Sequence, residues 1–328
     1  MSLLKTSCIT RHPSNPILTA DRIPYPATLI FNAGVAKFRG RYVMAFRNDY
    51  GGTLGHDGFK GTNIGLAWSD DGIQWTPEPL PWIEWNEGAD GEIRRAYDPR
   101  ITVIDDRAYL CFAVDTKHGV RGGVAVTDDF KDWKILNLST PDNRNMVILP
   151  EKVNGKFCRL ERPFPIYGRG APENFDLWFS DSPDGAYWGN HQLVLGSEQV
   201  TWSNSKIGPG APPVKTEQGW LTLFHAVSKF PDREFPAWHA DWNKSYMMGL
   251  MLLDLEEPWK VIGMHREPLM VAETDYERAG FRGEVLFPGG MILEPDGEVK
   301  IYYGAADTVE CLATARVEDL LALCQEPL

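Results

Sequence analysis

The feature that most constrains the fold of this chain is a unit of strand, tight polar turn and second apolar strand that occurs five times. Two of the turns contain the pairs Asn154-Gly155 and Asp296-Gly297, which strongly favour two-stranded hairpins. The five turns lie at residues 38–42, 105–107, 153–156, 217–220 and 295–298. Such repetition indicates a fold built from similar sheets in series.

A third strand follows most of these hairpins, and three of the third strands lead into a similar acidic turn. These turns end in Trp75, Trp133 and Trp188, whose rings we expect to pack on the sheets. We therefore predict an all-β fold, a five-bladed β-propeller with residues 1–328 as a single catalytic domain. The alternative, a β-sandwich, does not require five similar units. Only residues 317–323 have a helical pattern.

The composition excludes several classes of protein. Lys and Arg number 33 against 45 Asp and Glu, a net charge of −12, which argues against a nucleic-acid partner. The five cysteines are scattered without a CxxC pair, so we expect neither a disulfide framework nor a zinc site. No HExxH pattern or nucleotide-binding loop occurs, and we expect no metal.

The sequence also contains features that bear on the protein's cellular location. The first residues lack the apolar segment of a signal peptide, and the most apolar stretch, residues 247–253, is too short to span a bilayer. We expect a cytoplasmic protein with no membrane partner. A homo-oligomer is compatible with the sequence, which does not define the oligomeric state.

Polar residues recur at equivalent places in all five units. In a propeller the first strand of each blade lines a central channel, and its start lies beside the end of the second strand. The starts contain Asn32 and residues 97–100, 143–145, 206–210 and 287–290. The ends contain residues 47–49, Asp115, residues 161–162, His225 and Asp307. We predict that these residues gather at one end of the channel and form the active site.

The residue types at this predicted site indicate an anion and a sugar. The third and fourth units supply four potential cations, namely Arg144, Arg162, Lys206 and His225. Planar guanidinium groups suit the geometry of phosphate. Asp98 faces this cluster from the second unit, and carboxylates with arginine suit the hydroxyl groups of a sugar ring. Candidate apolar faces for the sugar are Tyr97, Trp202, Phe287 and Tyr303.

Long motifs at these places resemble those of glycoside hydrolase family 130, the β-mannoside phosphorylases. They are residues 11–16, 31–35, 46–51, 97–100, 115–123, 141–146, 206–213 and 303–308, in the family's order and over nearly the whole chain. The family's fold is a five-bladed propeller. The resemblance implies an inverting phosphorolysis, in which inorganic phosphate cleaves a terminal β-mannoside to α-D-mannose 1-phosphate and the free sugar.

The resemblance also implies roles for single residues. Asp98 matches the family's general acid, which acts through the mannose 3-hydroxyl. The positions that match phosphate-binding residues are Arg144, Asn145, Arg162, Lys206 and His225. The implied substrate-binding residues are Arg47, Asn48, Asp49, Tyr97 and Asp307. Phosphate is then a cosubstrate, and no other cofactor is expected.

Two other functions remain open from the residues alone. An inverting hydrolase needs an acid and a base about 6.5–9.5 Å apart, whereas a phosphorylase needs only the acid because phosphate is itself the nucleophile. An inverting β-mannosidase would use Asp49 or Asp307 as its base. A carbohydrate-binding propeller without catalysis would have no need of the cation cluster.

The identity of the released sugar depends on loops at the mouth of the channel. Residues 46–51 and 118–123 look most like the family branch that acts on 4-O-β-D-mannosyl-D-glucose; other branches take β-1,4-mannooligosaccharides or β-1,2-mannobiose. The candidate loops are residues 51–61, 82–95 and 230–244. The last contains Trp238, His239 and Trp242, which either stack on a sugar or pack on one another.

Overall fold

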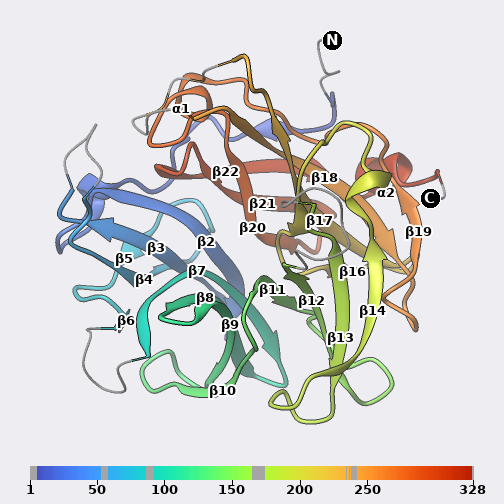
Figure 1. Cartoon of the computed structure of the whole chain (residues 1–328), viewed down its shortest axis with the longest axis horizontal. Coiled ribbons are helices and arrows are strands. Elements are labelled where there is room, and N and C mark those ends of the chain that lie inside the picture. The colour runs from blue at the N-terminus through green and yellow to red at the C-terminus, as the bar shows by residue number, and fades with distance from the viewer. Residues whose placement is uncertain are drawn as a thin grey trace.

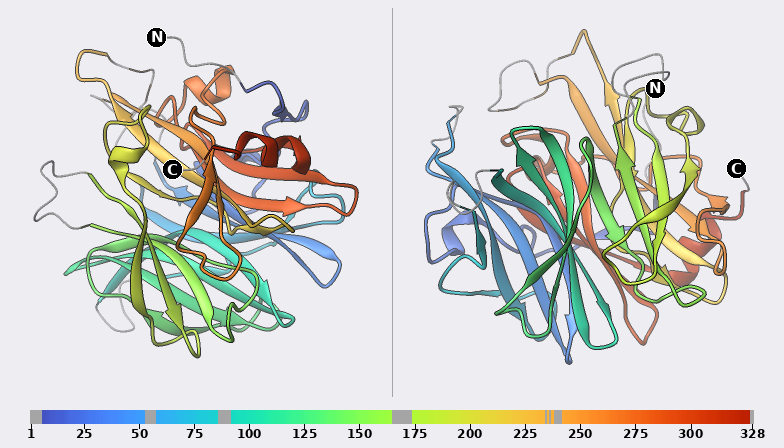
Figure 2. Two further views of the ribbon diagram at one scale, coloured as in Figure 1. Left: turned by 90° about the vertical axis from the view of Figure 1, so that its right-hand side faces the viewer. Right: turned by 60° about the horizontal axis from the view of Figure 1, so that its bottom comes forward.

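The structure is a computed structural model that describes residues 6–52, 58–85, 92–164, 174–233, 235, 237 and 242–326. Its strands form five antiparallel sheets set around a common axis (Figure 1). The prediction of a five-bladed propeller is confirmed. The side views show the twisted sheets packed around the ring (Figure 2).

The first three blades follow one another along the chain from the inner to the outer strand. Blade 1 contains β2 (Leu29–Phe38), β3 (Arg41–Tyr50), β4 (Gly61–Ser69), β5 (Thr76–Pro77) and β6 (Ile83–Glu84). Blade 2 contains β7 (Ile93–Ile104), β8 (Arg107–Thr116), β9 (Gly119–Thr127) and β10 (Lys134–Leu138). Blade 3 contains β11 (Asn143–Ile148), β12 (Phe157–Pro163), β13 (Leu177–Ser182) and β14 (Gly189–Leu195).

The last two blades complete the ring. Blade 4 contains β15 (Ile207–Pro209), β16 (Val214–Lys215), β17 (Trp220–Lys229), β18 (Lys244–Leu253) and β19 (Val261–Met264). Blade 5 contains β20 (Leu286–Leu293), β21 (Glu298–Ala305), β22 (Val309–Arg316) and β1 (Thr10–Arg11). The helix predicted at the end of the chain is confirmed as α2 (Val317–Leu323). The helix α1 (Asp275–Arg278) and the 3₁₀ turns Ala20–Arg22 and Ser197–Gln199 are too short to give a sequence periodicity.

The core of the protein lies between neighbouring blades. Val43 of blade 1 packs in one cluster with Leu110 of blade 2, and Tyr109 of blade 2 packs in another with Phe157 of blade 3. Equivalent clusters join blades 3 and 4, blades 4 and 5, and blades 5 and 1. Each sheet therefore buries both faces against its neighbours, which explains why apolar residues dominate the strands.

Blade 5 closes the ring with a strand from the other end of the chain. Thr10 and Arg11 of β1, dark blue in Figure 1, pair with Thr314 and Ala313 of β22. The Arg11 guanidinium donates to Glu277 at 2.7 Å and to Glu273 at 2.5 Å. The sequence does not predict this strand, because two residues carry no alternation that distinguishes a strand from a loop.

Candidate active site

The inner strands of blades 1, 2 and 3 each contain a β-bulge, with one extra residue opposite the second strand. Asn32, Asp98 and Asn145 occupy these bulges in the left-handed region, with φ of 54°, 52° and 57°. Asn and Asp adopt this conformation more readily than other residues with a side chain. A bulge re-aims its side chain, and all three residues line one pocket at the centre of the ring.

This central pocket has a volume of about 80 Å³ and receives side chains from all five blades. The predicted site residues that line it are Arg47, Tyr97, Asp98, Arg144, Asn145, Arg162 and Asp307. Asn32, Tyr246, Arg282, Val285 and Phe287 complete the lining. The structure thus brings together residues from β2, β3, β7, β11 and β12 that are far apart in the sequence.

Arg100 forms a structural tie beside the pocket. Its fully buried guanidinium donates to the carbonyl groups of Asn32, Pro99, Gly210 and Pro288, at 2.7–3.1 Å. These carbonyls belong to blades 1, 2, 4 and 5. The arginine therefore fixes the inner strands of these blades relative to one another.

Asp98 is held by two donors from blade 1, which bond to the same carboxylate oxygen. Its Oδ1 accepts hydrogen bonds from Asn32 Nδ2 at 3.0 Å and from Arg47 Nη1 at 3.4 Å. Burial alone would raise the pKa of Asp98, but the charge of Arg47 and the hydrogen bond from Asn32 outweigh it, and the pKa lies below its ordinary value. Asp98 is therefore a carboxylate at neutral pH in the protein without ligands. To act as a general acid, it must take up a proton when ligands bind.

Arg144 and Arg162 lie directly opposite each other on β11 and β12. Among the described residues, neither guanidinium has a carboxylate within ion-pair distance, and the buried Nε of each lacks a hydrogen-bond partner. Burial and the charge of Arg144 lower the pKa of Arg162 to about 9. Like charges directly opposite on paired strands destabilise a sheet. A bound anion would remove this repulsion and satisfy the unused donors.

His225 lies behind Arg162 and does not line the central pocket. Its ring is fully buried, with Nε2 2.9 Å from Arg162 Nη1 and Nδ1 3.1 Å from the Pro209 carbonyl. Because arginine only donates, Nε2 accepts and Nδ1 carries the proton. Burial and the nearby charges of Arg162 and Lys206 hold the pKa of His225 well below its ordinary value. The prediction that His225 adds a positive charge is wrong: the ring is neutral and supports Arg162.

Lys206 also lies outside the lining of the central pocket. It is buried, and its Nζ is 5.8 Å from the centre of the Tyr246 ring, which does line the pocket. The ammonium group is therefore one side chain removed from the pocket, on the side of blade 4.

Asp49 and Asn48 do not line the pocket, although both were predicted to bind substrate. Arg47 donates to both carboxylate oxygens of Asp49, at 3.0 and 2.7 Å, and Thr62 adds a third hydrogen bond. Asp49 therefore fixes Arg47. Asn48 donates to Pro26 and Asn63, because successive side chains of a strand point to opposite faces. Three consecutive residues of β3 cannot all face one pocket.

Arg282 and Tyr246 are pocket residues that the sequence analysis missed. Arg282 Nη1 donates to Asp307 Oδ2 at 3.0 Å, while burial raises the pKa of Asp307 above its ordinary value. Trp242, a candidate for stacking on a sugar, instead stacks on Tyr246, and the centre of its ring lies 5.2 Å from Cζ of Arg282. Trp238 and His239 of the same candidate loop lie outside the described residues.

Two of the predicted aromatic faces are elsewhere. Tyr97 and Phe287 line the pocket, whereas Trp202 stacks on Phe224. Tyr303 is fully buried in the interface between blades 4 and 5, and its hydroxyl donates to Glu277. Trp202 lies in a turn before β15 and Tyr303 in β21, and both rings pack against the core and not in the pocket.

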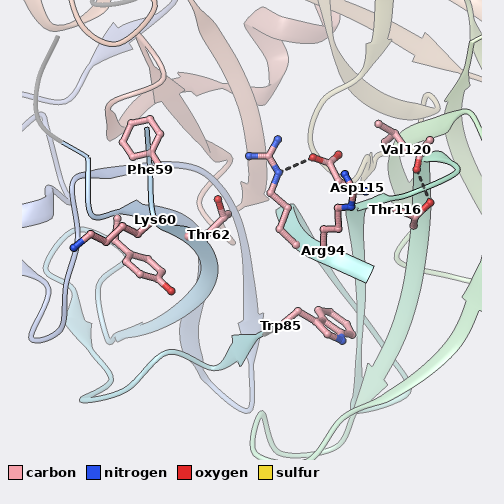
Figure 3. A pocket seen from close by; sticks show the side chains of 12 residues that line it. Phe59, Lys60, Thr62, Trp85, Arg94, Asp115, Thr116 and Val120 are labelled. Atoms are coloured by element: carbon pink, nitrogen blue, oxygen red, sulfur yellow. Dashed lines mark hydrogen bonds and ion pairs between the residues drawn. The ribbon is translucent and has the colours of Figure 1, made fainter. Parts of the chain in front are cut away.

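A second, larger cavity of about 740 Å³ lies between blades 1 and 2 (Figure 3). One of its residues, Asp115, accepts a hydrogen bond from Tyr97 of the central pocket. Its aromatic walls are Tyr50, Phe59 and Trp85, and its charged side chains are Lys60, Arg94, Arg95 and Asp115. Parts of the predicted loops at 51–61 and 82–95 line it, and residues 53–57 and 86–91 of these loops lie outside the described residues. We call this space the blade 1–2 cavity.

Comparisons with known proteins agree with this architecture. A family model of glycoside hydrolase family 130, described as β-1,4-mannooligosaccharide phosphorylase, matches residues 10–326. The chain is 33% identical over 324 residues to the β-1,4-mannooligosaccharide phosphorylase of Ruminococcus albus, covering 95% of this chain and 90% of the relative. It is 30% identical over 331 residues to the 4-O-β-D-mannosyl-D-glucose phosphorylase of Bacteroides fragilis, covering 95% and 78%.

A solved structure supports the same relationship. The β-1,2-mannobiose phosphorylase of Listeria innocua, in complex with β-1,2-mannobiose, is similar to this chain with a TM-score of 0.81 and 27% identity. The match covers 97% of this chain and 99% of that chain. The fold, the order of the motifs and the length of these matches lead to one conclusion: the chain belongs to glycoside hydrolase family 130.

Proposed function

We propose that the protein is an inverting phosphorylase that cleaves a terminal β-1,4-mannoside with inorganic phosphate, releasing α-D-mannose 1-phosphate and the free sugar. The observation that carries this proposal is the facing pair Arg144 and Arg162, which has no carboxylate partner among the described residues. A phosphate ion fits such a pair by geometry and by charge. A hydrolase has no use for an anion at this position.

The remaining residues of the pocket suit the other half of the reaction. Phosphate held by the two arginines is a nucleophile positioned against the anomeric carbon, with its charge offset by the guanidinium groups. Asp98, across the pocket, protonates the departing oxygen by way of the mannose 3-hydroxyl. Its proton enters with the ligands, because the charge of phosphate opposes that of the arginines which keep Asp98 ionised. Arg47 and the Arg282–Asp307 pair supply polar partners for the mannose hydroxyls.

The blade 1–2 cavity suits the sugar that is released. Its residue Asp115 accepts a hydrogen bond from Tyr97 of the central pocket, and its aromatic walls offer faces on which a sugar ring can stack. The matching family model and two relatives have names that specify a β-1,4 linkage, which supports a β-1,4-mannoside. Relatives with names that specify a β-1,2 linkage also match the chain. The motifs at 46–51 and 118–123 favour 4-O-β-D-mannosyl-D-glucose as the substrate to test first.

If the protein were instead an inverting β-mannosidase, it would need a carboxylate that acts as general base. Asp49 is a poor candidate, because both of its carboxylate oxygens accept hydrogen bonds from Arg47. Asp307 lines the pocket and has a raised pKa, so it is the carboxylate through which hydrolysis would proceed.

The test is cleavage of 4-O-β-D-mannosyl-D-glucose with and without inorganic phosphate. We expect cleavage only with phosphate and a product that is α-D-mannose 1-phosphate by ³¹P NMR. Equal rates in phosphate-free buffer would overturn the proposal in favour of hydrolysis through Asp307. Sugar binding without any turnover, with either this disaccharide or β-1,4-mannobiose, would identify a binding protein.

The Arg144→Ala variant tests the assignment of the anion. Loss of one charged hydrogen-bonding partner should raise the KM for phosphate by at least about tenfold, with a smaller effect on the KM for the mannoside. Arg107→Ala is the matched control, because Arg107 pairs with Asp128 on the exposed side of blade 2. An unchanged KM for phosphate in Arg144→Ala would contradict the assigned role.

A further inference from the structure

Asp115, near the end of β8, lines the blade 1–2 cavity (Figure 3) and contacts a residue of the central pocket. Its Oδ1 accepts a hydrogen bond of 2.7 Å from the hydroxyl of Tyr97, which lines the central pocket. Its Oδ2 accepts one of 2.6 Å from Nε of Arg95, which lines the cavity. One carboxylate oxygen of Asp115 therefore accepts a hydrogen bond from a residue of the central pocket, and the other accepts one from a residue of the cavity.

The Tyr97 hydroxyl extends this contact to the anion-binding pair. Burial raises the pKa of Tyr97 to about 12, so the phenol keeps its single proton at neutral pH. That proton is donated to Asp115, which leaves the oxygen lone pairs to accept from Arg144 Nη1 at 3.3 Å. The direction of the Tyr97 hydroxyl, and with it the contact to Arg144, thus depends on an acceptor at position 115.

We propose that Asp115 is a positioning residue shared by both spaces: it orients Tyr97 toward Arg144 and holds Arg95 on the wall of the cavity. The inference rests on the proposed function, in which phosphate binds at Arg144 and the released sugar occupies the cavity. Asp115 touches neither reacting group and acts through its two neighbours. It therefore affects the binding of both phosphate and sugar.

Asp115→Asn separates these contacts while keeping the shape of the side chain. An amide has one accepting oxygen and one donating nitrogen. If the oxygen faces Tyr97, the nitrogen opposes the Arg95 donor. If the amide is reversed, the Tyr97 proton turns toward the Arg144 donor. We expect the KM for phosphate, or for glucose in the reverse reaction with α-D-mannose 1-phosphate, to rise about tenfold, the effect of losing one hydrogen bond to a charged group.

A change confined to KM identifies positioning. The kcat at saturating substrates should stay within about twofold, because binding and not the chemical step is altered. Asp128→Asn is the matched control: it breaks the Arg107–Asp128 pair, which also joins neighbouring strands of blade 2 but lies on the exposed side. It should leave both KM values unchanged. Thermal unfolding of both variants reports whether the fold is retained.

A double-mutant cycle tests the route through Tyr97. In a Tyr97→Phe background, Asp115→Asn should add no further rise in the KM for phosphate. Independent, additive effects of the two substitutions on that KM would overturn the route, and an Asp115→Asn variant indistinguishable from Asp128→Asn would overturn the whole inference. Calorimetric titration with inorganic phosphate separates this from failure of the proposed function. If the wild type binds no phosphate, the proposed function fails; if wild type and Asp115→Asn bind phosphate equally and the KM for glucose is also unchanged, the inference about Asp115 fails.

Discussion

Asp98 combines a left-handed backbone with a carboxylate buried against Arg47 and Asn32. The backbone conformation comes from the bulge in β7, and the neighbouring Pro99 and Arg100 fix the strand after it. Equivalent bulges in β2 and β11 contain Asn32 and Asn145, also with left-handed backbones. One backbone device, used in three blades, thus directs three polar side chains toward a single pocket.

Replacement of Asp98 by asparagine should abolish most turnover and preserve the fold. The amide oxygen can still accept from Asn32, and asparagine tolerates the left-handed backbone, but the side chain can no longer transfer a proton. We expect kcat to fall by about 10²–10⁴, the range of general acid assistance. Asp105→Asn, at another left-handed position (φ 51°) in the turn of the same blade, should retain wild-type kcat. Retention of more than a tenth of the activity by Asp98→Asn would contradict the role of Asp98.

At the residue scale, the sequence predicts positions better than orientations. Asp98, Arg144 and Arg162 line the pocket because they occupy equivalent places in repeated hairpins. The neutral state of His225 depends on burial by other blades, which no local pattern contains. Arg282 lies in a segment before β20 and outside the strand ends that were compared, so the repeat gave no signal for it.

At the scale of strands, the pocket depends on very close approach of the inner strands. A Cβ atom on Gly34 of β2 would lie 2.6 Å from Cα of Arg100 and 2.8 Å from N of Ile101, both in the backbone of β7. Glycine at this position therefore allows β2 and β7 to lie against each other beside the bulges that carry Asn32 and Asp98.

Substitution of Gly34 by alanine should force these two strands apart. We expect the free energy of unfolding in urea to fall by about 1–3 kcal/mol, the usual effect of overpacking. Turnover should fall as well, because β7 carries Asp98. Gly189→Ala at the start of β14 is the matched control, since its added Cβ would meet no atom within 4 Å. Equal stability of the two variants would show that the strands can separate without loss.

The sequence predicts the strands of the five hairpins but not the strand β1 or the bulges. The five hairpins were found because two apolar runs flank a polar turn, a pattern that survives in any tertiary setting. The strand β1 and the bulges were not found, since each depends on a partner strand. Local sequence patterns predict which segments form strands, whereas the tertiary arrangement of the blades determines which strands pair.

At the scale of the whole molecule, the last blade is completed by a strand from the other end of the chain, which Arg11 anchors. Its guanidinium bonds to Glu277, Glu273 and the Val271 carbonyl, in the segment that leads into blade 5. The side chain of Glu277 is fully buried, and it also accepts from the Tyr303 hydroxyl. Burial would raise the pKa of Glu277, but the hydrogen bond from Arg11 and other donors lower it below its ordinary value.

The helices of the described residues are all too short or too polar to span a membrane.

Arg11→Met should weaken the anchoring of β1. We expect the free energy of unfolding at pH 7 to fall by about 1.5–3 kcal/mol, because a buried carboxylate loses a charged donor. The lowered pKa of Glu277 means that this contribution is present above the ordinary value of 4.5 and is lost as the pH falls below it. The difference between variant and wild type should therefore shrink in acid. In an added Glu277→Gln background, Arg11→Met should have a smaller effect; equal effects in both backgrounds would exclude this pair as the cause.

The pairing of β1 with β22 also has a consequence for synthesis on the ribosome. Thr10 and Arg11 are translated about 300 residues before their partners Ala313 and Thr314. At about 5–20 residues per second, the first strand waits on the order of 15–60 s for its partner. Throughout that interval β22, on which β1 pairs, does not yet exist, so the nascent protein cannot complete its last sheet until β22 has been translated.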